Sequence, residues 1–347
     1  MKIDLDQSDI FLSNMDLSHE ARSIVASGIL KGKFQEVSTQ FTIESKFDFS
    51  TLIVNEIIKA CWGDLIECYA DVSISKSIDK INLLSIVQDN IINGTKLVSV
   101  RFTRFKDIYC FYISINHALA DETTLSEIKY AIESVNKYGI SETLNKLRDY
   151  SEEYKRYVRS QVIQIENIDK DLVNEGSTPA KIRHDGPLSW NVNKAFSVVR
   201  SRQTFPTKQK AMDCTIKWLH GEKILYKGNF VCSSKNWRKG RSVGMQTGLV
   251  PKFLNGEDYS QYHCLEHLAK ISPEYKELFN KCVSSEIFIN GSAPRSIECH
   301  KKKSRSFPVG IDFYENLEGT YEIVLEGRFS NRVDLIRSLE KVSKYVS

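Results

Sequence analysis

Two apolar, β-rich runs separated by a short polar turn stand out in the first third of the chain. Residues 96–105 and 108–115 are rich in Val, Ile, Phe and Tyr, and Lys106-Asp107 lies between them. These residue types favour strands, so the pattern predicts a β-hairpin. From Thr123 onward, apolar residues recur at helical spacing (Leu125, Ile128, Ile132, Val135), which predicts a helix. Residues 116–122 therefore form a strand-to-helix connection.

The same patterns predict elements in the rest of the chain. Apolar residues recur at helical spacing over residues 52–65, which predicts a helix with Ser50 as its N-cap. The predicted later elements are an alternating strand at 320–327 and an amphipathic final helix at 333–346.

The predicted connection carries the chain's best candidate for chemistry. Its sequence is Asn-His-Ala-Leu-Ala-Asp-Glu, with His117 directly after the strand and Asp121 four residues later. A neutral imidazole can accept a proton from a hydroxyl or ammonium group near pH 7, as a general base in acyl transfer must. Loops held by a rigid scaffold commonly carry function. The alternative for His117 is a buried histidine satisfied by local hydrogen bonds.

With this loop and this order of elements, the sequence resembles the chloramphenicol acetyltransferase-like superfamily, and within it the condensation domains of nonribosomal peptide synthesis. The signature of these domains is His-His-x-x-x-Asp-Gly, which His117 and Asp121 match at the second His and the Asp. Asn116 replaces the first His and Glu122 the Gly. The order of elements follows the family over nearly the whole chain, as a shortened two-lobe version. The resemblance implies a first core strand and helix within 35–67, a charged, Tyr-bearing helix at 145–165, a strand ending in Arg at 231–238 and an apolar strand ending in Asn at 286–290.

The resemblance implies roles for individual residues. His117 is the catalytic residue, and Asp121 is structural, paired with an arginine from later in the chain. Arg238 is the expected partner, with Arg241 in reserve, and Asn116 is a structural residue of the site. The substrate-binding residues expected on the same basis are Asn290, at the end of the strand 286–290, and Thr124.

The resemblance also implies an α/β (α+β) fold of two lobes in a V, each an open mixed sheet flanked by helices. Residues 1–170 form the N-terminal lobe with the His loop, and residues 191–347 form the C-terminal lobe. The linker is placed at residues 171–190, where Gly, Pro and Asp, all turn formers, are concentrated.

Composition restricts the function classes. Hydrophobic residues make up 41% and charged residues 27% of the 347 positions, which is ordinary for a globular protein of one or two domains. The net charge of +4 does not point to nucleic acid. No membrane segment and no signal peptide are visible, so we expect a cytoplasmic protein. The eight scattered cysteines fit buried, reduced thiols.

Three further patterns are weaker candidates. His263 and His267 have the i, i+4 spacing of some zinc sites, but no matching ligand set accompanies them, so we expect a helix surface and no metal. Gly240, Gly244 and Gly248 match neither a phosphate loop nor a dinucleotide fingerprint, which favours turns and strands. The basic run at 300–305 is either a solvated loop or a contact for phosphates or an acidic carrier protein.

Three hypotheses for the function follow. The first is a free-standing condensation-type acyltransferase that makes an amide or ester bond in natural-product biosynthesis. Its donor is an acyl group on the phosphopantetheine of a carrier protein that acts in trans, and its acceptor is a small amine or alcohol. The second is an acyltransferase that uses acyl coenzyme A. The third is a catalytically silent scaffold, which the replacement of Gly by Glu122 keeps open. No permanently bound cofactor is expected.

Overall fold

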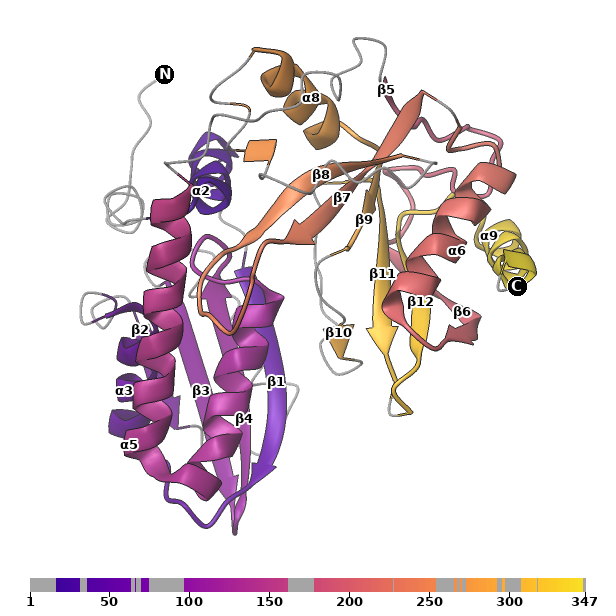
Figure 1. Cartoon of the computed structure of the whole chain (residues 1–347). Coiled ribbons are helices and arrows are strands. Elements are labelled where there is room, and N and C mark those ends of the chain that lie inside the picture. The colour runs from indigo at the N-terminus through magenta and orange to yellow at the C-terminus, as the bar shows by residue number, and fades with distance from the viewer. Residues whose placement is uncertain are drawn as a thin grey trace. The chain divides into compact units, whose positions relative to one another are not determined.

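The computed structural model describes residues 17–31, 36–63, 66, 70–74, 97–161, 178–226, 228–253, 265–266, 269, 273–291, 295–296, 307–316 and 318–345. The chain divides into two compact units, drawn in Figure 1. The first consists of Met1–Ile165 together with Arg238–Gln246, and the second of Glu166–Trp237 and Thr247–Ser347. None of the helices in these ranges is long and apolar enough to cross a membrane.

The first unit is a four-stranded mixed sheet with helices packed on one face. The strand order is β1 (Glu36–Glu44), β4 (Ile108–Asn116), β3 (Val98–Phe105) and β2 (Ala70–Ile74), antiparallel except for the β2–β3 pair. The predicted hairpin is therefore confirmed, with Lys106 in its turn at a positive φ of 55°. The helices of this unit are α2 (His19–Lys31), α3 (Thr51–Trp62) and α5 (Glu122–Ser160).

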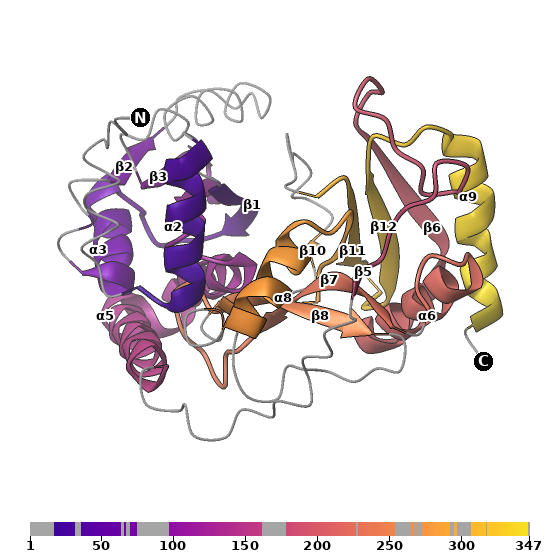
Figure 2. The ribbon, with the colours of Figure 1, turned by 90° about the horizontal axis from the view of Figure 1, so that it is seen from above.

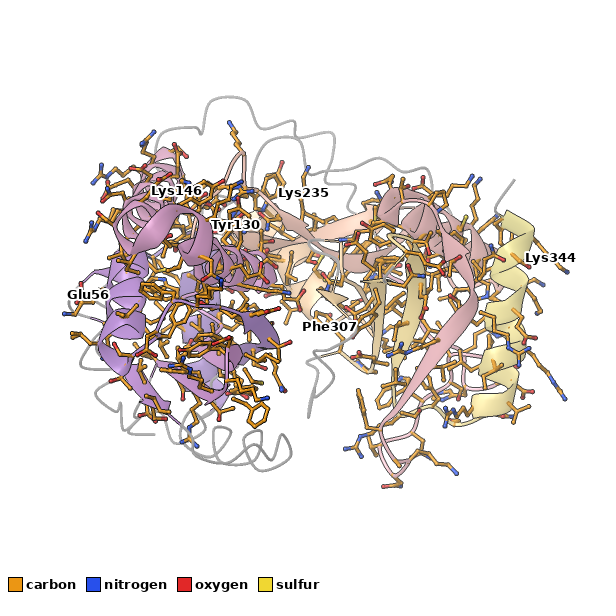
Figure 3. The ribbon with its side chains drawn as sticks, turned by 90° about the horizontal axis from the view of Figure 1, so that it is seen from below. Glu56, Tyr130, Lys146, Lys235, Phe307 and Lys344 are labelled. Carbon is orange, nitrogen blue, oxygen red and sulfur yellow. The ribbon has the colours of Figure 1, made fainter. Side chains whose placement is uncertain are left out.

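The core of the first unit lies between the sheet and the helices α3 and α5, which lie on the same side of the strands in Figure 2. Alternate residues of β3 and β4, such as Val100, Phe111 and Ile113, face this core. The predicted cap of α3 is confirmed, since the Ser50 side chain accepts a hydrogen bond from the Ile53 amide. Away from the sheet, Glu56 of α3 and Lys146 of α5 lie on the outer surface (Figure 3).

The helix α5 consists of two helical segments that meet at Gly139. The segments expected separately at 123–135 and 145–165 are joined through Gly139, whose φ of 78° and ψ of 167° form a kink. Glycine adopts this backbone conformation without steric penalty. The two helices that the sequence predicts are therefore present, and the break between them is at Gly139.

The second unit is an eight-stranded mixed sheet. Its main strand order is β5 (Thr178–Pro179), β7 (Asn229–Asn236), β9 (Ile287–Ile289), β11 (Val309–Glu315), β12 (Tyr321–Gly327) and β6 (Ser197–Phe205). The remaining strands are β8 (Thr247–Phe253), which pairs with β7, and β10 (Arg295–Ser296), which pairs with β11.

Helices cover both faces of this second sheet, as Figure 2 shows. The helices α6 (Lys208–Gly221) and α9 (Arg332–Glu340) pack on one face, and the 3₁₀ helix η4 (Lys341–Tyr345) continues α9. The helix α8 (Pro273–Val283) packs on the opposite face, against β7 and β8. The expected α/β fold with two mixed sheets flanked by helices is confirmed.

The division between the units departs from the sequence-based one in two places. Residues 178–190, expected within a linker, pair β5 with β7 and place Ala180 and Leu188 in the second core. Arg238–Gln246, expected within the C-terminal lobe, belongs to the first unit although it connects β7 to β8 of the second. The linker was inferred from turn-forming residues in the first region. The second segment, Arg238–Gln246, has no distinctive composition that would indicate its return to the first unit.

Candidate functional site

Asn116, the last residue of β4, shapes the turn that carries His117. Its amide donates to the Leu97 carbonyl at 2.8 Å, which keeps it in the sheet. Its side-chain Oδ1 accepts from the Ala118 amide at 3.0 Å, and its carbonyl accepts from the Leu119 amide at 2.9 Å. Asn side chains commonly close turns in this way. Asn116 is buried and lies where a structural residue of the loop was expected.

The half-buried His117 ring is held through one nitrogen. Its Nδ1 lies 2.9 Å from the Ala120 carbonyl oxygen. A carbonyl can only accept a hydrogen bond, so we assign the proton to Nδ1. Nε2 of the neutral ring then carries the lone pair. This is the tautomer that a general base acting through Nε2 requires.

Asp121 begins the helix α5. It is the N-cap, with φ −106° and ψ 178°, and its Oδ1 accepts from the Thr124 amide at 2.8 Å. Glu122, which replaces the Gly of the family signature, is the first residue of the helix. A carboxylate in a helix's first turn is stabilised by the helix dipole. The Glu122 position is therefore compatible with the loop geometry.

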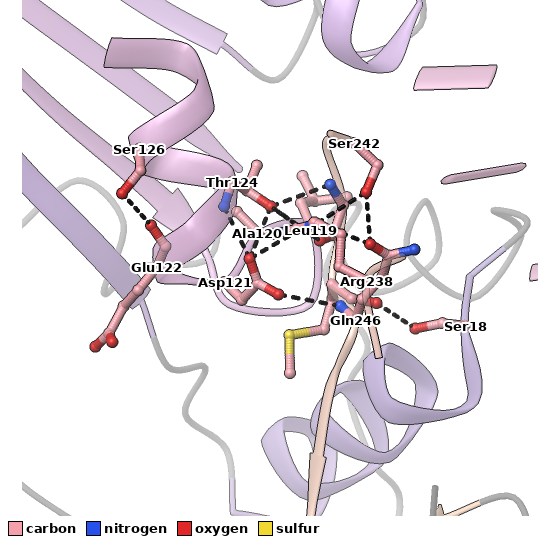
Figure 4. A network of polar contacts seen from close by, with 12 residues as sticks. Ser18, Leu119, Ala120, Asp121, Glu122, Thr124, Ser126, Arg238, Ser242 and Gln246 are labelled. Carbon is pink, nitrogen blue, oxygen red and sulfur yellow. Dashed lines mark hydrogen bonds and ion pairs between the residues drawn. The ribbon is translucent and has the colours of Figure 1, made fainter. Parts of the chain in front are cut away.

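The structure brings Asp121 and Arg238 together in a buried ion pair (Figure 4). Arg238 Nη2 lies 3.1 Å from Asp121 Oδ1, and the two side chains are only 6% and 4% exposed. Both partners make further hydrogen bonds. Arg238 Nε donates to Ser242 Oγ at 2.8 Å and to Gln246 Oε1 at 2.9 Å, and the Gln246 amide donates to Asp121 Oδ2 at 3.3 Å.

Thr124 lies inside this network. Its Oγ1 is 2.9 Å from both Asp121 Oδ1 and the Gly244 carbonyl, and it accepts from Arg238 Nη2 at 3.1 Å. The residue is completely buried. This position differs from the substrate contact expected for Thr124, because its hydroxyl is surrounded by groups of the protein. Thr124 instead joins the start of α5 to the segment Arg238–Gln246.

Arg241, the reserve partner, lies in a different environment. It is half exposed, its Nη1 is 3.8 Å from Glu127 Oε2, and its guanidinium lies over the Tyr130 ring at 4.2 Å. Burial raises the pKa of the Glu127 carboxyl, and the charges of Arg241 and Arg238 oppose that rise. Arg241 thus attaches its segment to the outer side of α5.

Asn290 follows β9 in the second unit, where it is buried. Its Nδ2 donates to Asp312 Oδ1 at 2.9 Å, and its Oδ1 accepts from Ser234 Oγ at 3.2 Å. These contacts fix the side-chain amide across strands β7, β9 and β11. A role for Asn290 toward a substrate stays a prediction.

Sequence reasoning missed several residues that complete the loop. Ser18, just before α2, donates its hydroxyl to the Met245 carbonyl at 2.7 Å, and its amide donates to Tyr154 Oη at 3.2 Å. Gln246 contacts both members of the ion pair. Apart from the contact between Arg238 and Gln246, these contacts join positions more than 100 residues apart, and no periodicity or spacing along the chain indicates them. Only Gly244 had a signal, the recurrence of glycine in that segment.

The other candidates yield little in the described part of the chain. His263, His267 and the basic run 300–305 lie outside it. Within it, no three His, Cys, Asp or Glu side chains gather as a metal site. The described cysteines are free thiols and are mostly buried: Cys61, Cys110, Cys214, Cys232 and Cys282. Burial raises the pKa of the Cys61 thiol, so it is not a reactive nucleophile.

Comparison of structures shows what this fold is similar to. The tallysomycin biosynthesis protein TlmII matches with a TM-score of 0.53 and 12% identity, over 90% of this chain and 94% of its own. The first condensation domain of the calcium-dependent antibiotic synthetase, in complex with a substrate analogue, matches at 0.52 and 11%, over 95% of each chain. A variant of the starter condensation domain of rhizomide synthetase RzmA, in complex with C8-CoA, matches at 0.55 and 9%, over 95% and 93%.

By sequence, the chain matches neither a protein-family model nor a curated protein. The likeness thus rests on the structure. It extends over nearly the full length of both chains in each comparison. The chain has the fold of condensation domains.

Proposed function

Because the chain has the condensation-domain fold, we propose that it is a condensation-type acyltransferase with His117 as its general base. The reaction is attack of an amine or hydroxyl on an acyl thioester, which forms an amide or ester in natural-product biosynthesis. The observation that carries the proposal is the His117 ring, whose Nδ1 is 2.9 Å from the Ala120 carbonyl and whose Nε2 is therefore the basic nitrogen.

In this mechanism His117 moves one proton. Nε2 takes the proton of the attacking amine or hydroxyl as it adds to the thioester carbonyl. The C–S bond breaks when the tetrahedral intermediate collapses, and the leaving thiolate takes the proton from Nε2, which restores the neutral ring. The Ala120 carbonyl stabilises the imidazolium through Nδ1–H. General-base catalysis of this kind typically contributes about 10²–10⁴-fold. No covalent enzyme intermediate is required.

The buried ion pair has a different part in the mechanism. Asp121 caps α5 directly after Ala120, so its contacts with Arg238 and Gln246 fix the peptide that orients the imidazole. Asp121 itself exchanges no proton with the substrate. We propose that its loss affects folding and loop geometry more than proton transfer.

Two thioester donors are candidates. A phosphopantetheine thioester on an acyl or peptidyl carrier protein fits the condensation-domain neighbours. A coenzyme A thioester is favoured by one specific observation, the C8-CoA complex of the RzmA starter domain. Both donors carry the same pantetheine thioester, so the mechanism is the same for either. A small amine or alcohol is the acceptor in both cases.

The test is a product assay with a matched control. The wild-type protein, His117→Ala and His220→Ala are incubated with acyl-carrier and acyl-CoA thioesters and mixed amines and alcohols, and products are followed by mass spectrometry. His220 is a suitable control because its Nδ1 also lies 2.9 Å from a carbonyl, that of Leu225, in the second unit. We expect product that is lost in His117→Ala and retained in His220→Ala.

The donor that gives product identifies the subclass. Product that persists in His117→Ala would refute the general-base role. No product from any donor would argue for a catalytically silent scaffold and against the proposed function.

A further inference from the structure

The two faces of the first unit's sheet differ in composition. The core face is apolar, whereas the alternate positions on the other face are mostly polar. On the central strands β3 and β4 these polar-face residues are Ser99, Arg101, Thr103, Cys110, Tyr112, Ser114 and Asn116. We call this side the polar face of the sheet. Such a face is ordinarily solvated in an antiparallel sheet.

The polar face is nevertheless buried along its centre. Ser99 and Ser114, which lie opposite each other, are completely inaccessible, and Tyr112 is 4% exposed. The Arg101 side chain, opposite Tyr112, is 14% exposed. Buried polar groups are nearly always hydrogen-bonded, and each one left unpaired costs about 1–3 kcal/mol.

Two of these groups lack a partner. Neither Ser99 Oγ nor Arg101 Nε has a hydrogen-bond partner among the described residues. The nearest carboxylate to Arg101 is Asp71, with 3.9 Å between Nη2 and Oδ2, which leaves Nε unsatisfied. Ser99 and Arg101 are two positions apart on one strand, so their side chains project to the same side. The result is a pair of neighbouring buried donors.

The charges on the face indicate what these donors bind. Arg101 is the one cation on the polar face in the described strands β1 to β4. The carboxylate of Glu36 lies at the other end, opposite Asn116, and accepts a hydrogen bond from Ser114 at 3.1 Å. Asp71 also lies on this face, opposite Ser99, and its carboxylate offsets part of the Arg101 charge. Of the two ends of the face, the Arg101 end is still the one with a cation that can attract an anion, whereas the Glu36 carboxylate repels one. A guanidinium and a hydroxyl together suit a carboxylate or a phosphate.

We propose that Arg101 and Ser99 bind an anionic group, carboxylate or phosphate, of the substrate that reacts at His117. This inference rests on the proposed function, because the anionic group belongs to the substrate of that reaction. Tyr112, the register partner of Arg101, precedes Asn116 by four residues, which is about 14 Å along a strand that rises roughly 3.4 Å per residue. The substrate is accordingly an extended molecule with its anionic group remote from the reacting atom.

The first experiment measures binding without turnover. Inorganic phosphate and octanedioate, a linear dicarboxylate, are titrated by calorimetry into wild type, Arg101→Gln, Arg101→Lys and Arg104→Gln, each also in a His117→Ala background. Arg104 is the matched control because it lies on the same strand, is exposed, and pairs with Asp48 at 2.7 Å. We expect saturable binding that is weakened about tenfold or more in Arg101→Gln and unchanged in Arg104→Gln.

The outcomes separate this site from the reaction. Binding that is retained in the His117→Ala background supports the site even where no product forms. The two proposals can therefore fail independently: the binding assay tests the anion site, and the product assay tests the acyltransferase activity. Preference for phosphate or for octanedioate identifies the anionic group. Equal binding by wild type and Arg101→Gln, equal weakening by Arg104→Gln, or no saturable binding of either probe would overturn the proposal.

A second measurement does not depend on a variant that removes the charge. The ¹⁵Nε–H resonance of Arg101 is assigned by its absence in Arg101→Lys and followed in the wild-type protein during the same titrations. We expect a saturable shift of this resonance with at least one probe. A resonance that does not move while other arginine signals do would refute the site.

Discussion

Asp121 and Arg238 are ionic side chains in a place that excludes water almost entirely. Removing charges from water costs several kcal/mol per ion, and their attraction repays this only when further hydrogen bonds satisfy the remaining atoms. Here Ser242, Gln246 and Thr124 supply those bonds. The pair therefore depends on its surroundings, and each partner depends on the other.

The first prediction concerns the loss of one partner. Arg238→Met leaves the Asp121 carboxylate buried without its cation, and we expect the free energy of unfolding to fall by about 3–5 kcal/mol. Arg156→Ala is the control, because its pair with Glu153, at 2.8 Å, is exposed and worth at most about 1 kcal/mol. Urea unfolding of both variants measures the difference.

A double-mutant cycle completes this test. Asp121→Asn combined with Arg238→Met removes both charges, so we expect the double variant to lose less stability than the sum of the single variants. Additive losses would show that the two residues do not act as a pair. A stable, inactive Asp121→Ala protein would contradict the structural role proposed for Asp121.

At the residue scale, the sequence leads to some site residues and not to others. The segments that contain His117, Asp121 and Arg238 resemble segments of the family, so these three residues could be selected from the sequence. Thr124 was expected to contact the substrate, but its hydroxyl contacts the carbonyl of Gly244, 120 residues later. Burial of that kind arises from the tertiary fold and leaves no local pattern.

Among the elements, the segment Arg238–Gln246 has the most demanding geometry. Gly244 has a φ of +148°, a backbone conformation that L side chains rarely adopt, and a Cβ there would overlap the Tyr154 ring. Its carbonyl accepts from Arg238 Nη2 at 2.9 Å. The close approach of backbone to ring is available only to glycine.

The second prediction follows from this approach. Gly244→Ala forces the segment away from Tyr154, and we expect it to destabilise the protein by about 1–3 kcal/mol through overpacking and backbone strain. Gly240→Ala is the matched control, because no atom lies within 4 Å of its added Cβ. Thermal and urea unfolding report the result. Equal effects of the two substitutions would refute this role of Gly244.

Elements with strong local signals were predicted well. The hairpin β3–β4 has dense β-branched and aromatic residues and a polar turn, and α3 has both periodicity and the Ser50 cap. The strand β12 and helix α9 alternate or repeat clearly. The two segments of α5 were predicted separately, and the break between them is at Gly139, whose positive φ is readily adopted by glycine.

On the scale of the whole molecule, one chain forms two compact units and passes from one to the other more than once. The concentration of turn formers near residues 171–190 locates the main crossing approximately. The return of Arg238–Gln246 to the first unit is invisible in composition, since that segment has ordinary polar residues. A boundary inferred from composition divides the chain at one place, so it misses a short segment that returns to the first unit.

The third prediction concerns alkaline pH. Burial raises the pKa of Tyr154 to about 12, and the Ser18 amide, which donates to its oxygen, opposes that rise. An unfolded tyrosine has a pKa of about 10. The stabilisation by protonated Tyr154 is fully present below about pH 10 and is lost as pH rises through about 12, a change of about 2–3 kcal/mol.

Urea unfolding between pH 9 and 11.5 tests this dependence. We expect wild type to lose stability more steeply than Tyr154→Phe, because only the wild type must keep this phenol protonated to remain folded. Tyr226→Phe, which changes an exposed ring, should follow the wild-type profile. Parallel profiles for wild type and Tyr154→Phe would contradict the prediction.

The return of Arg238–Gln246 to the first unit has a consequence for folding during synthesis on the ribosome. Synthesis runs from the N-terminus, so all of α5 emerges while Arg238 is still about 80 codons away. During that interval the Asp121 carboxylate has no guanidinium, and Thr124 and Tyr154 lack the backbone that covers them. The first unit therefore cannot complete the contacts of its histidine loop until the segment after β7 has been translated.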